Sequence, residues 1–175
     1  LPVRDHTSVF IEKAVGYYRS NHLAGCFDDG AVLRATTLQE PGWEGETPQA
    51  QLAVAYWNGE AQDYDLALRN AYYVADVAVD KALFAIRMHG YDPPAQSLPM
   101  QRVSGMVAGY LETGDPYLLD TARAVAESAY SWDRANWPRR SFGRDAAYIR
   151  GLVYLCRYLG DPGDLARARE ALHRV

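Results

Sequence analysis

The chain is poor in the residues that carry metal, redox and phosphate chemistry. Its 175 residues include only two cysteines and four histidines, and neither type occurs at a spacing typical of a metal site. The sequence contains no glycine-rich phosphate loop and no nucleophile elbow. We therefore expect no metal and no cofactor.

An excess of basic residues and long hydrophobic runs are also lacking. The formal net charge is −4 at pH 7, whereas nucleic acid and anionic membranes require a broad basic surface. The purely apolar runs are only a few residues long, too short to cross a bilayer. We expect neither nucleic acid nor a membrane among the partners. The N-terminus has no signal-peptide layout and no initiator Met.

The two cysteines, Cys26 and Cys156, lie far apart in the sequence. Cys156 falls in an apolar helical segment, where a cysteine commonly acts as a small buried residue. Two ordinary thiols are the favoured interpretation, and a disulfide is the alternative.

The sequence does contain an internal repeat. Gly105-Met106 is followed by Gly114-Asp115-Pro116, and 46 residues later Gly151-Leu152 is followed by Gly160-Asp161-Pro162. A mostly apolar segment separates the two glycines of each copy, and an Ala/Arg/Leu-rich helical pattern follows each Gly-Asp-Pro. A fixed period of this size predicts stacked helical hairpins, each a helix, a tight turn and a second helix.

Apolar residues at helical spacing extend this pattern over most of the chain. The predicted helices cover residues 6–22, 49–57, 62–88, 100–111, 117–130, 144–159 and 164–174. Asn58-Gly59 occupies the turn position of a third, more divergent hairpin, and a long loop covers 21–48, with short strand character at 31–35. In the long helix 62–88, Asp76 and Asp80 are one turn apart and are interpreted as a hydrated stripe or as helix-pairing residues.

These elements predict an all-α fold with a single helical domain over residues 1–175. The period overlaps that of HEAT repeats, and spacing alone does not separate an open helical-repeat solenoid from an α/α toroid. The first helix of each hairpin is apolar with Tyr, Gly and Arg, as expected of an inner helix, whereas the second helices are half charged, like an outer ring. We favour repeated antiparallel hairpins forming an α/α toroid or part of one, with the solenoid as the alternative.

Three hairpins are about half of a six-hairpin ring. We expect the remainder of the toroid to come from unseen sequence or from another subunit. The missing initiator Met and the end of the chain inside a helical pattern favour a segment of a longer protein.

The connections between hairpins are long, whereas the turns within hairpins are short. In an antiparallel array, the long connections at 21–48, 89–99 and 131–143 fall at one end. Long loops gathered beside helix N-termini make a plausible site for an anionic ligand.

The stretch from Gln101 to Met106, the stretch from Tyr110 to Asp115 and the Ala/Arg-rich helix after them resemble a known group. They are similar to the helical-toroid domains of bacterial carbohydrate-active enzymes, among them the rhamnogalacturonan and other uronate-polysaccharide lyases. The resemblance covers residues 63–175 and implies a toroid acting on an acidic polysaccharide. Lys81 stands where such lyase-like toroids often have a His, which is a departure from their pattern.

A uronate lyase must neutralise a carboxylate, remove the C5 proton and protonate the leaving oxygen. Tyr148 and His89 are our candidates for the acid or base, and Arg102 and Arg144 for the carboxylate. The structural alternatives are a core position for Tyr148 and a helix C-terminal cation for His89.

Residues 132–145 combine Trp and Arg side chains, which suit a ligand with flat sugar faces and carboxylates. The candidate substrate-binding residues are Trp43, Arg102, Trp137, Arg139, Arg140, Arg144 and Asp145. The alternatives are a surface loop with ordinary ion pairs and, for the last two residues, a structural pair and N-cap.

A glycosidase would instead need two carboxyl groups across the scissile bond. Glu44 is the candidate, because desolvation by the neighbouring Trp43 would raise its pKa, although loop acids are usually solvated. We therefore expect a domain that degrades an oligo- or polysaccharide substrate by lyase or hydrolase chemistry. The alternative is a non-catalytic helical-repeat module that binds protein or glycan.

Overall fold

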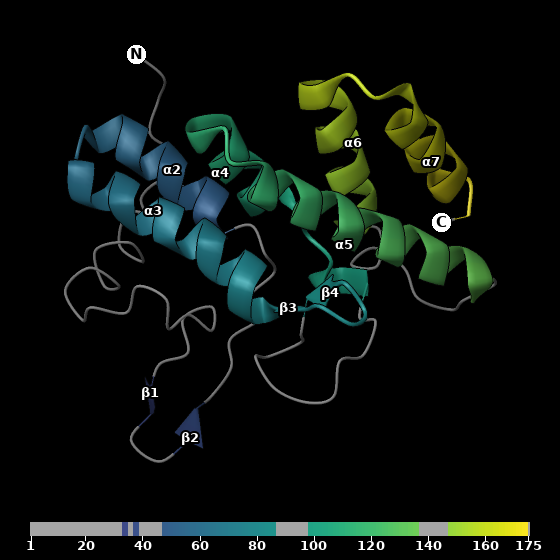
Figure 1. Cartoon of the computed structure of the whole chain (residues 1–175), viewed down its shortest axis with the longest axis horizontal. Helices are drawn as coiled ribbons and strands as arrows, with labels where there is room; N and C mark the ends of the chain where they lie inside the picture. The colour runs from purple at the N-terminus through teal and green to yellow at the C-terminus, as the bar shows by residue number, and fades with distance from the viewer. Residues whose placement is uncertain (1–32, 35–36, 39–46, 87–97, 137–146, 175) are drawn as a thin grey trace.

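The computed structural model describes residues 33–34, 37–38, 47–86, 98–136 and 147–174, and these are mostly helical. The α-helices in this part of the chain are α2 (Thr47–Asn58), α3 (Ala61–Tyr73), α4 (Ser104–Thr113), α5 (Pro116–Ala135), α6 (Ala147–Leu159) and α7 (Pro162–Leu172). The prediction of an all-α fold is confirmed (Figure 1).

The helices pack in consecutive pairs, α2 with α3, α4 with α5 and α6 with α7, and two residues join the members of each pair (Figure 1). In the first pair, Asn58 donates to Asp63 at 3.4 Å, and further from the turn Asn70 donates to Gln51 at 2.6 Å. The first bond joins residues 58 and 63, and the second joins residues 51 and 70 on either side of them, as occurs when two helices run antiparallel. The predicted turns at Asn58-Gly59, Gly114-Asp115-Pro116 and Gly160-Asp161-Pro162 are confirmed.

The two Gly-Asp-Pro turns have the same local structure. Gly114 and Gly160 adopt φ of 70° and 75°, where a side chain would be strained. Each following Asp caps the next helix, because its side chain accepts from a backbone N–H two residues on, at 3.0 Å for Asp115 and 2.8 Å for Asp161. The Pro then occupies the first turn of the helix, where no N–H is needed.

Glycines bring α4 and α6 close to their neighbours. A Cβ on Gly109 of α4 would lie 2.8 Å from the Cβ of Ala71 in α3 and 3.0 Å from Leu118 in α5. A Cβ on Gly151 of α6 would lie 2.8 Å from Cγ2 of Val103, directly before α4. α4 also contacts α2, so the first helices of the three hairpins adjoin one another.

The hydrophobic core lies between the hairpins, and α4, α5, α6 and α7 each contribute to it, together with buried residues of the segment 74–86 that follows α3. On α5, Leu118, Ala122, Val125 and Ala129 are buried at intervals of three and four residues. Burying this stripe stabilises the helix, since α5 alone would be marginal in water.

The predicted helix 62–88 is wrong for residues 79–86, and residues 87–88 lie outside the described part of the chain. α3 ends in a π-helical turn, Val74–Ala78, and the chain then forms a hairpin of β3 (Val79–Asp80) with β4 (Ala85–Ile86). Asp80 stabilises the turn, because its Oδ1 accepts from the N–H groups of Ala82 and Leu83. Asp76 and Asp80 thus lie on different elements, and the interpretation as a helical stripe is wrong.

A contact distant in sequence fixes the end of this hairpin. The buried Gln101 side chain accepts from the N–H of Ile86 at 2.7 Å and donates to its carbonyl at 3.1 Å. Side-chain amides can replace a neighbouring strand in this way, so the edge of β4 is satisfied without a third strand.

Smaller differences occur at the other elements. α4 begins at Ser104 and is preceded by a 3₁₀ turn, Leu98–Met100, whereas the prediction began at residue 100. β1 (Leu33–Arg34) falls within the predicted strand 31–35 and pairs with the unpredicted β2 (Thr37–Leu38). The predicted helix 6–22 lies outside the described residues, and none of the described helices combines the length and apolar character needed to cross a bilayer.

Candidate functional site

Two of the residues predicted for the site, Tyr148 and Arg102, lie in the described part of the chain. The other predicted residues lie outside it: Trp43, Glu44, His89, Trp137, Arg139, Arg140, Arg144 and Asp145. The structure therefore bears on the predicted site through the surroundings of Tyr148 and Arg102.

Tyr148 lies in the first turn of α6 and is fully buried. Its hydroxyl donates to Oδ2 of Asp133 at 2.6 Å. Asp133 lies near the end of α5, on the buried side of that helix. The bond therefore joins the end of the second hairpin to the start of the third.

Arg174, two residues beyond the end of α7, completes the same arrangement. Its Nε and Nη2 both lie 3.1 Å from Oδ2 of Asp133. The side chains are 12% and 1% exposed, so this is a nearly buried ion pair. Removing one partner of such a pair leaves an uncompensated buried charge and is strongly destabilising.

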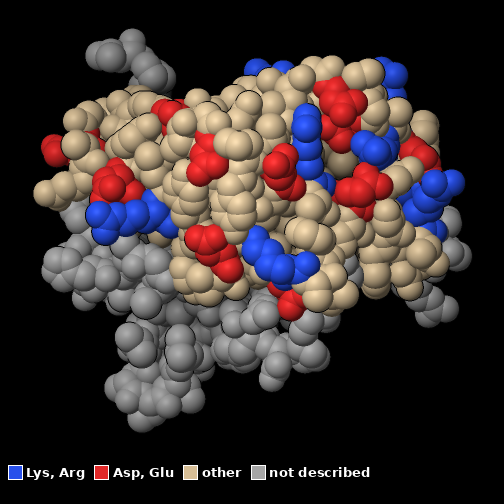
Figure 2. All heavy atoms as spheres, in the orientation of Figure 1, with Lys and Arg blue, Asp and Glu red and all other residues tan. Residues whose placement is uncertain are grey.

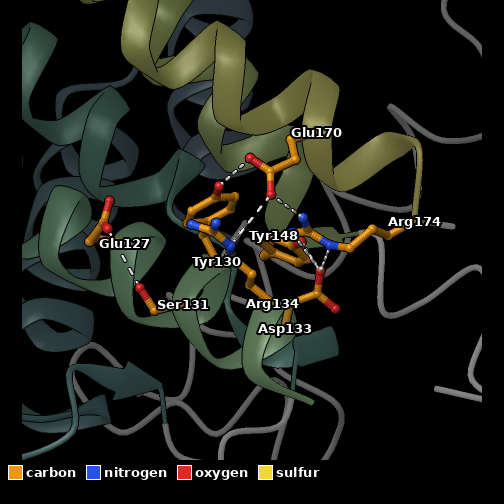
Figure 3. Close-up of polar contacts among 8 residues, drawn as sticks. All are labelled: Glu127, Tyr130, Ser131, Asp133, Arg134, Tyr148, Glu170 and Arg174. Atoms are coloured by element: carbon orange, nitrogen blue, oxygen red, sulfur yellow. Dashed lines mark hydrogen bonds and ion pairs between the residues drawn. The ribbon is translucent and has the colours of Figure 1, made fainter. Parts of the chain in front are cut away.

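Glu170 of α7 extends the arrangement toward the surface (Figure 3). It accepts from Nη1 of Arg174 at 2.7 Å and from the hydroxyl of Tyr130 at 2.6 Å. The Arg174 guanidinium also lies 5.4 Å from the centre of the Tyr130 ring. We call Tyr130, Asp133, Tyr148, Glu170 and Arg174 the Asp133 cluster.

The surroundings of Tyr148 hold its hydroxyl in the protonated form. Burial raises the pKa of Tyr148, and so do the hydrogen bond to Asp133 and the charge of that carboxylate, against the opposing effect of Arg174. Tyr148 is therefore a hydrogen-bond donor over the physiological pH range. To act as acid or base on a substrate, its hydroxyl would have to leave Asp133 and become accessible.

The sequence interpretation did not select Tyr130, Asp133, Glu170 or Arg174. A signal for Asp133 was present, because Ala126, Ala129, Tyr130 and Asp133 continue the buried spacing of α5. A carboxylate on a buried stripe implies a cationic or hydrogen-bonding partner. The partner Arg174 lies 41 residues away in sequence, and nothing local identifies it.

Arg102 precedes α4 and is half-buried. Its Nε donates to the carbonyl of Pro99 at 3.0 Å, which holds the side chain against the 3₁₀ turn. The proposed binding of a substrate carboxylate by Arg102 stays a prediction.

A second polar cluster joins the π-helical turn to α5. The Lys81 ammonium donates to the carbonyl of Ala75 and to the hydroxyl of Tyr117, and it lies 4.9 Å from the centre of the Tyr117 ring. Tyr117 in turn donates to Oδ1 of Asp76. Burial and the bond to Asp76 raise the pKa of Tyr117 to about 12, and burial lowers the pKa of Lys81.

Lys81, the residue that departs from the lyase-like pattern, thus donates to Ala75 and Tyr117 within the same domain. Within the described residues, no group of His, Cys, Asp and Glu is arranged to hold a metal ion. Cys156 is a free thiol and half-buried.

Comparison with protein-family models, with curated proteins and with solved structures found no match to this chain.

Proposed function

We propose that this chain is a domain of a carbohydrate-active enzyme that degrades an acidic, uronate-containing polysaccharide by lyase or hydrolase chemistry. The observation that carries the proposal is the Asp133 cluster. It joins the end of α5, the start of α6 and the end of α7, which are the helix ends remote from the Gly-Asp-Pro turns.

The cluster supports a site at this end because two of its members flank a segment rich in Trp and Arg. Asp133 and Tyr148 are 15 residues apart and directly bonded, and Trp137, Arg139, Arg140 and Arg144 lie between them. The residues that flank this Trp- and Arg-bearing segment, Asp133 and Tyr148, thus belong to one buried network. Trp rings stack on sugar faces and Arg binds carboxylates through paired hydrogen bonds.

The proposal is tested by incubating the protein with pectic substrates, alginate and glycosaminoglycans. A lyase produces the ultraviolet absorbance of an unsaturated uronate, whereas a hydrolase releases reducing ends without that absorbance. Absence of both signals on the whole panel would contradict the enzymatic proposal.

Two variants assign roles within the proposed site. Arg144→Ala should weaken binding of an acidic glycan much more than binding of a neutral one, and an equal loss for both would reject a carboxylate role. Tyr148→Phe should lower turnover by about 10² to 10⁴ if the hydroxyl transfers a proton. If turnover falls only in step with the folded fraction, Tyr148 is a structural residue.

The second candidate function is a non-catalytic module that binds glycan or protein. The complete burial of Tyr148 and its bond to Asp133 favour this candidate, since they give the hydroxyl a structural purpose. It predicts saturable binding of an acidic glycan without either cleavage signal.

A further inference from the structure

The turn glycines align the three hairpins residue by residue. Gly59, Gly114 and Gly160 each directly follow the first helix of a hairpin and adopt φ of 71°, 70° and 75°. Residues at the same distance from these glycines therefore hold equivalent positions in the repeat. Most of these positions keep their burial from the second hairpin to the third, as Met106 and Leu152 do.

One position is buried in the first two hairpins but exposed in the third. Seven residues before the turn glycine, Leu52 and Val107 are buried, whereas Val153 is 43% exposed. Val107 lies one helical turn after Val103, to whose carbonyl its N–H donates at 3.0 Å. Val103 in turn faces α6, since a Cβ on Gly151 would lie 2.8 Å from its side chain. The position thus belongs to the side of a hairpin that the next hairpin covers.

A second position, on the other helix of the hairpin, changes in the same way. Twelve residues after the turn glycine, Ala71 and Ala126 are buried, whereas Leu172 is 63% exposed. Ala71 packs on the next hairpin, because a Cβ on Gly109 of α4 would lie 2.8 Å from its own Cβ. Leu172 therefore lies on the side of α7 that would receive a further hairpin.

Val153 and Leu172 lie at the same level of the third hairpin. In the first hairpin, Asn70 donates to Gln51 at 2.6 Å, and these two residues directly precede the equivalents of Leu172 and Val153. We call Val153 and Leu172 the end patch, because α6 and α7 lie at one end of the array (Figure 1). Terminal repeats ordinarily present a polar outer face, so an apolar pair at this place indicates a surface that is covered.

The repeat also indicates what covers the end patch. Within the chain, a helix of the next hairpin lies against the equivalent positions, and a second copy of the chain can supply such a helix. The copy does not offer it from its first hairpin, where the counterpart of Gly109 is Val54, only 5% exposed. It does offer it from its third hairpin, where the end patch is open.

We propose that two copies of this chain associate through the end patch with two-fold symmetry. Leu172 would contact Val153 of the partner subunit, and Val153 would contact Leu172 of the partner subunit, as in an isologous interface. The contact removes apolar surface from water in both copies. The proposal does not depend on the proposed function, because the end patch includes no residue of the Asp133 cluster.

The test is sedimentation velocity of the whole chain over a range of concentrations, which distinguishes monomer from dimer. Leu172→Glu and Val153→Glu should each raise the Kd of the dimer by roughly tenfold or more, because the contact would bury a carboxylate. The matched control is Leu111→Glu on α4. Leu111 is 47% exposed, and its position, three residues before the turn glycine, is exposed in all three hairpins, so this variant should dimerise like the wild type.

A mixture of two variants tests the two-fold contact itself. Val153→Lys and Leu172→Glu should each dimerise poorly alone. In a dimer that contains one copy of each, one contact becomes a Lys–Glu pair and the other stays as in the wild type. The mixture should therefore dimerise more strongly than either variant alone, and a mixture that stays as monomeric as its components would overturn the two-fold pairing.

The remaining outcomes also decide the inference. A wild-type chain that is monomeric at every concentration overturns it, and so does a dimer that Leu172→Glu leaves unchanged. Growth beyond the dimer overturns the two-fold arrangement. Thermal unfolding of each variant separates these results from loss of the fold, and Leu172→Ser serves if Leu172→Glu unfolds. Cleavage of a polysaccharide, or its absence, bears on the proposed function alone.

Discussion

The first and second helices of the hairpins share the same core but differ on their outward sides. Figure 2 looks onto α3, α5 and α7, where Lys/Arg and Asp/Glu side chains are interspersed. On α2 and α6 the charged side chains are instead limited to Arg150 and Arg157, and neither helix carries an acidic residue. The predicted distinction between half-charged second helices and apolar first helices therefore agrees with the described surface.

The largest effect is expected for Asp133→Ala, which removes the hydrogen bond between a second helix, α5, and the first turn of a first helix, α6. We expect a loss of about 3 to 5 kcal/mol in the free energy of unfolding, because Arg174 and the buried Tyr148 hydroxyl lose their acceptor and only the more exposed Glu170 still pairs with Arg174. Urea unfolding measures the effect.

The matched control for Asp133→Ala is Glu127→Gln on the same helix. Glu127 also pairs with an arginine, Arg167 at 3.0 Å, but that pair is largely exposed. Exposed pairs contribute at most about 1 kcal/mol. Equal losses in the two variants would show that burial of the Asp133 cluster does not matter for stability.

The close approach of α4 to the second helices is tested by Gly109→Ala. The new methyl group would lie 2.8 Å from the Cβ of Ala71 and 3.0 Å from Leu118, and overpacking of this kind costs about 1 to 3 kcal/mol. The double variant Gly109→Ala/Ala71→Gly removes the shorter contact and should recover part of the loss. A Gly109→Ala variant as stable as the wild type would show that α4 can move away.

Substitutions of the capping aspartates in the two Gly-Asp-Pro turns should have smaller effects on stability, and the two turns should differ from each other. Asp161→Ala removes a helix cap and should cost about 1 kcal/mol. Asp115→Ala should cost more, because Asp115 also accepts from the hydroxyl of Tyr72 in the first hairpin at 2.7 Å. Tyr72→Phe should therefore destabilise the Asp161→Ala protein but add little to Asp115→Ala. The same effect of Tyr72→Phe in both backgrounds would disprove this coupling.

The smallest effect concerns a contact between two second helices, Tyr130 of α5 and Glu170 of α7. The Tyr130 hydrogen bond is the largest cause that lowers the pKa of Glu170 below its ordinary value of 4.5. A lowered folded-state pKa stabilises the fold above the unfolded pKa, and this contribution is lost as pH falls through the folded value.

Tyr130→Phe should therefore reduce the loss of stability on acidification below a pH of about 4.5. Denaturant unfolding of the variant and the wild type across this range measures the difference. Asp164, whose pKa is raised by burial, responds in the opposite direction but is present in both proteins. Parallel pH profiles would refute the role of Tyr130.

The turns and caps were predictable because their chemistry is local. Gly160-Asp161-Pro162 combines a left-handed glycine, a capping carboxylate and a proline within three residues, and the same three types stand at 114–116. The break after α3 was not predictable in this way. Residues 74–86 keep apolar side chains at helical spacing, and the bonds that hold β4 come from Gln101, 15 residues beyond it.

The same difference between local and long-range signals applies to the candidate site. The Trp- and Arg-bearing segment and Tyr148 were recognisable from residue types, whereas the partners of Tyr148 were not. Asp133 and Arg174 become a pair only when α5 and α7 pack together.

The sequence by itself thus determined the helical class, the three hairpin turns and the contrast between apolar and charged helices, since each depends on neighbours within a few residues. Tertiary structure decided where α3 ends, that Tyr148 is a buried donor to Asp133, and that Gln101 bonds to the edge of β4. The physical reason is that burial and hydrogen-bond partners between distant segments exist only after the hairpins have packed.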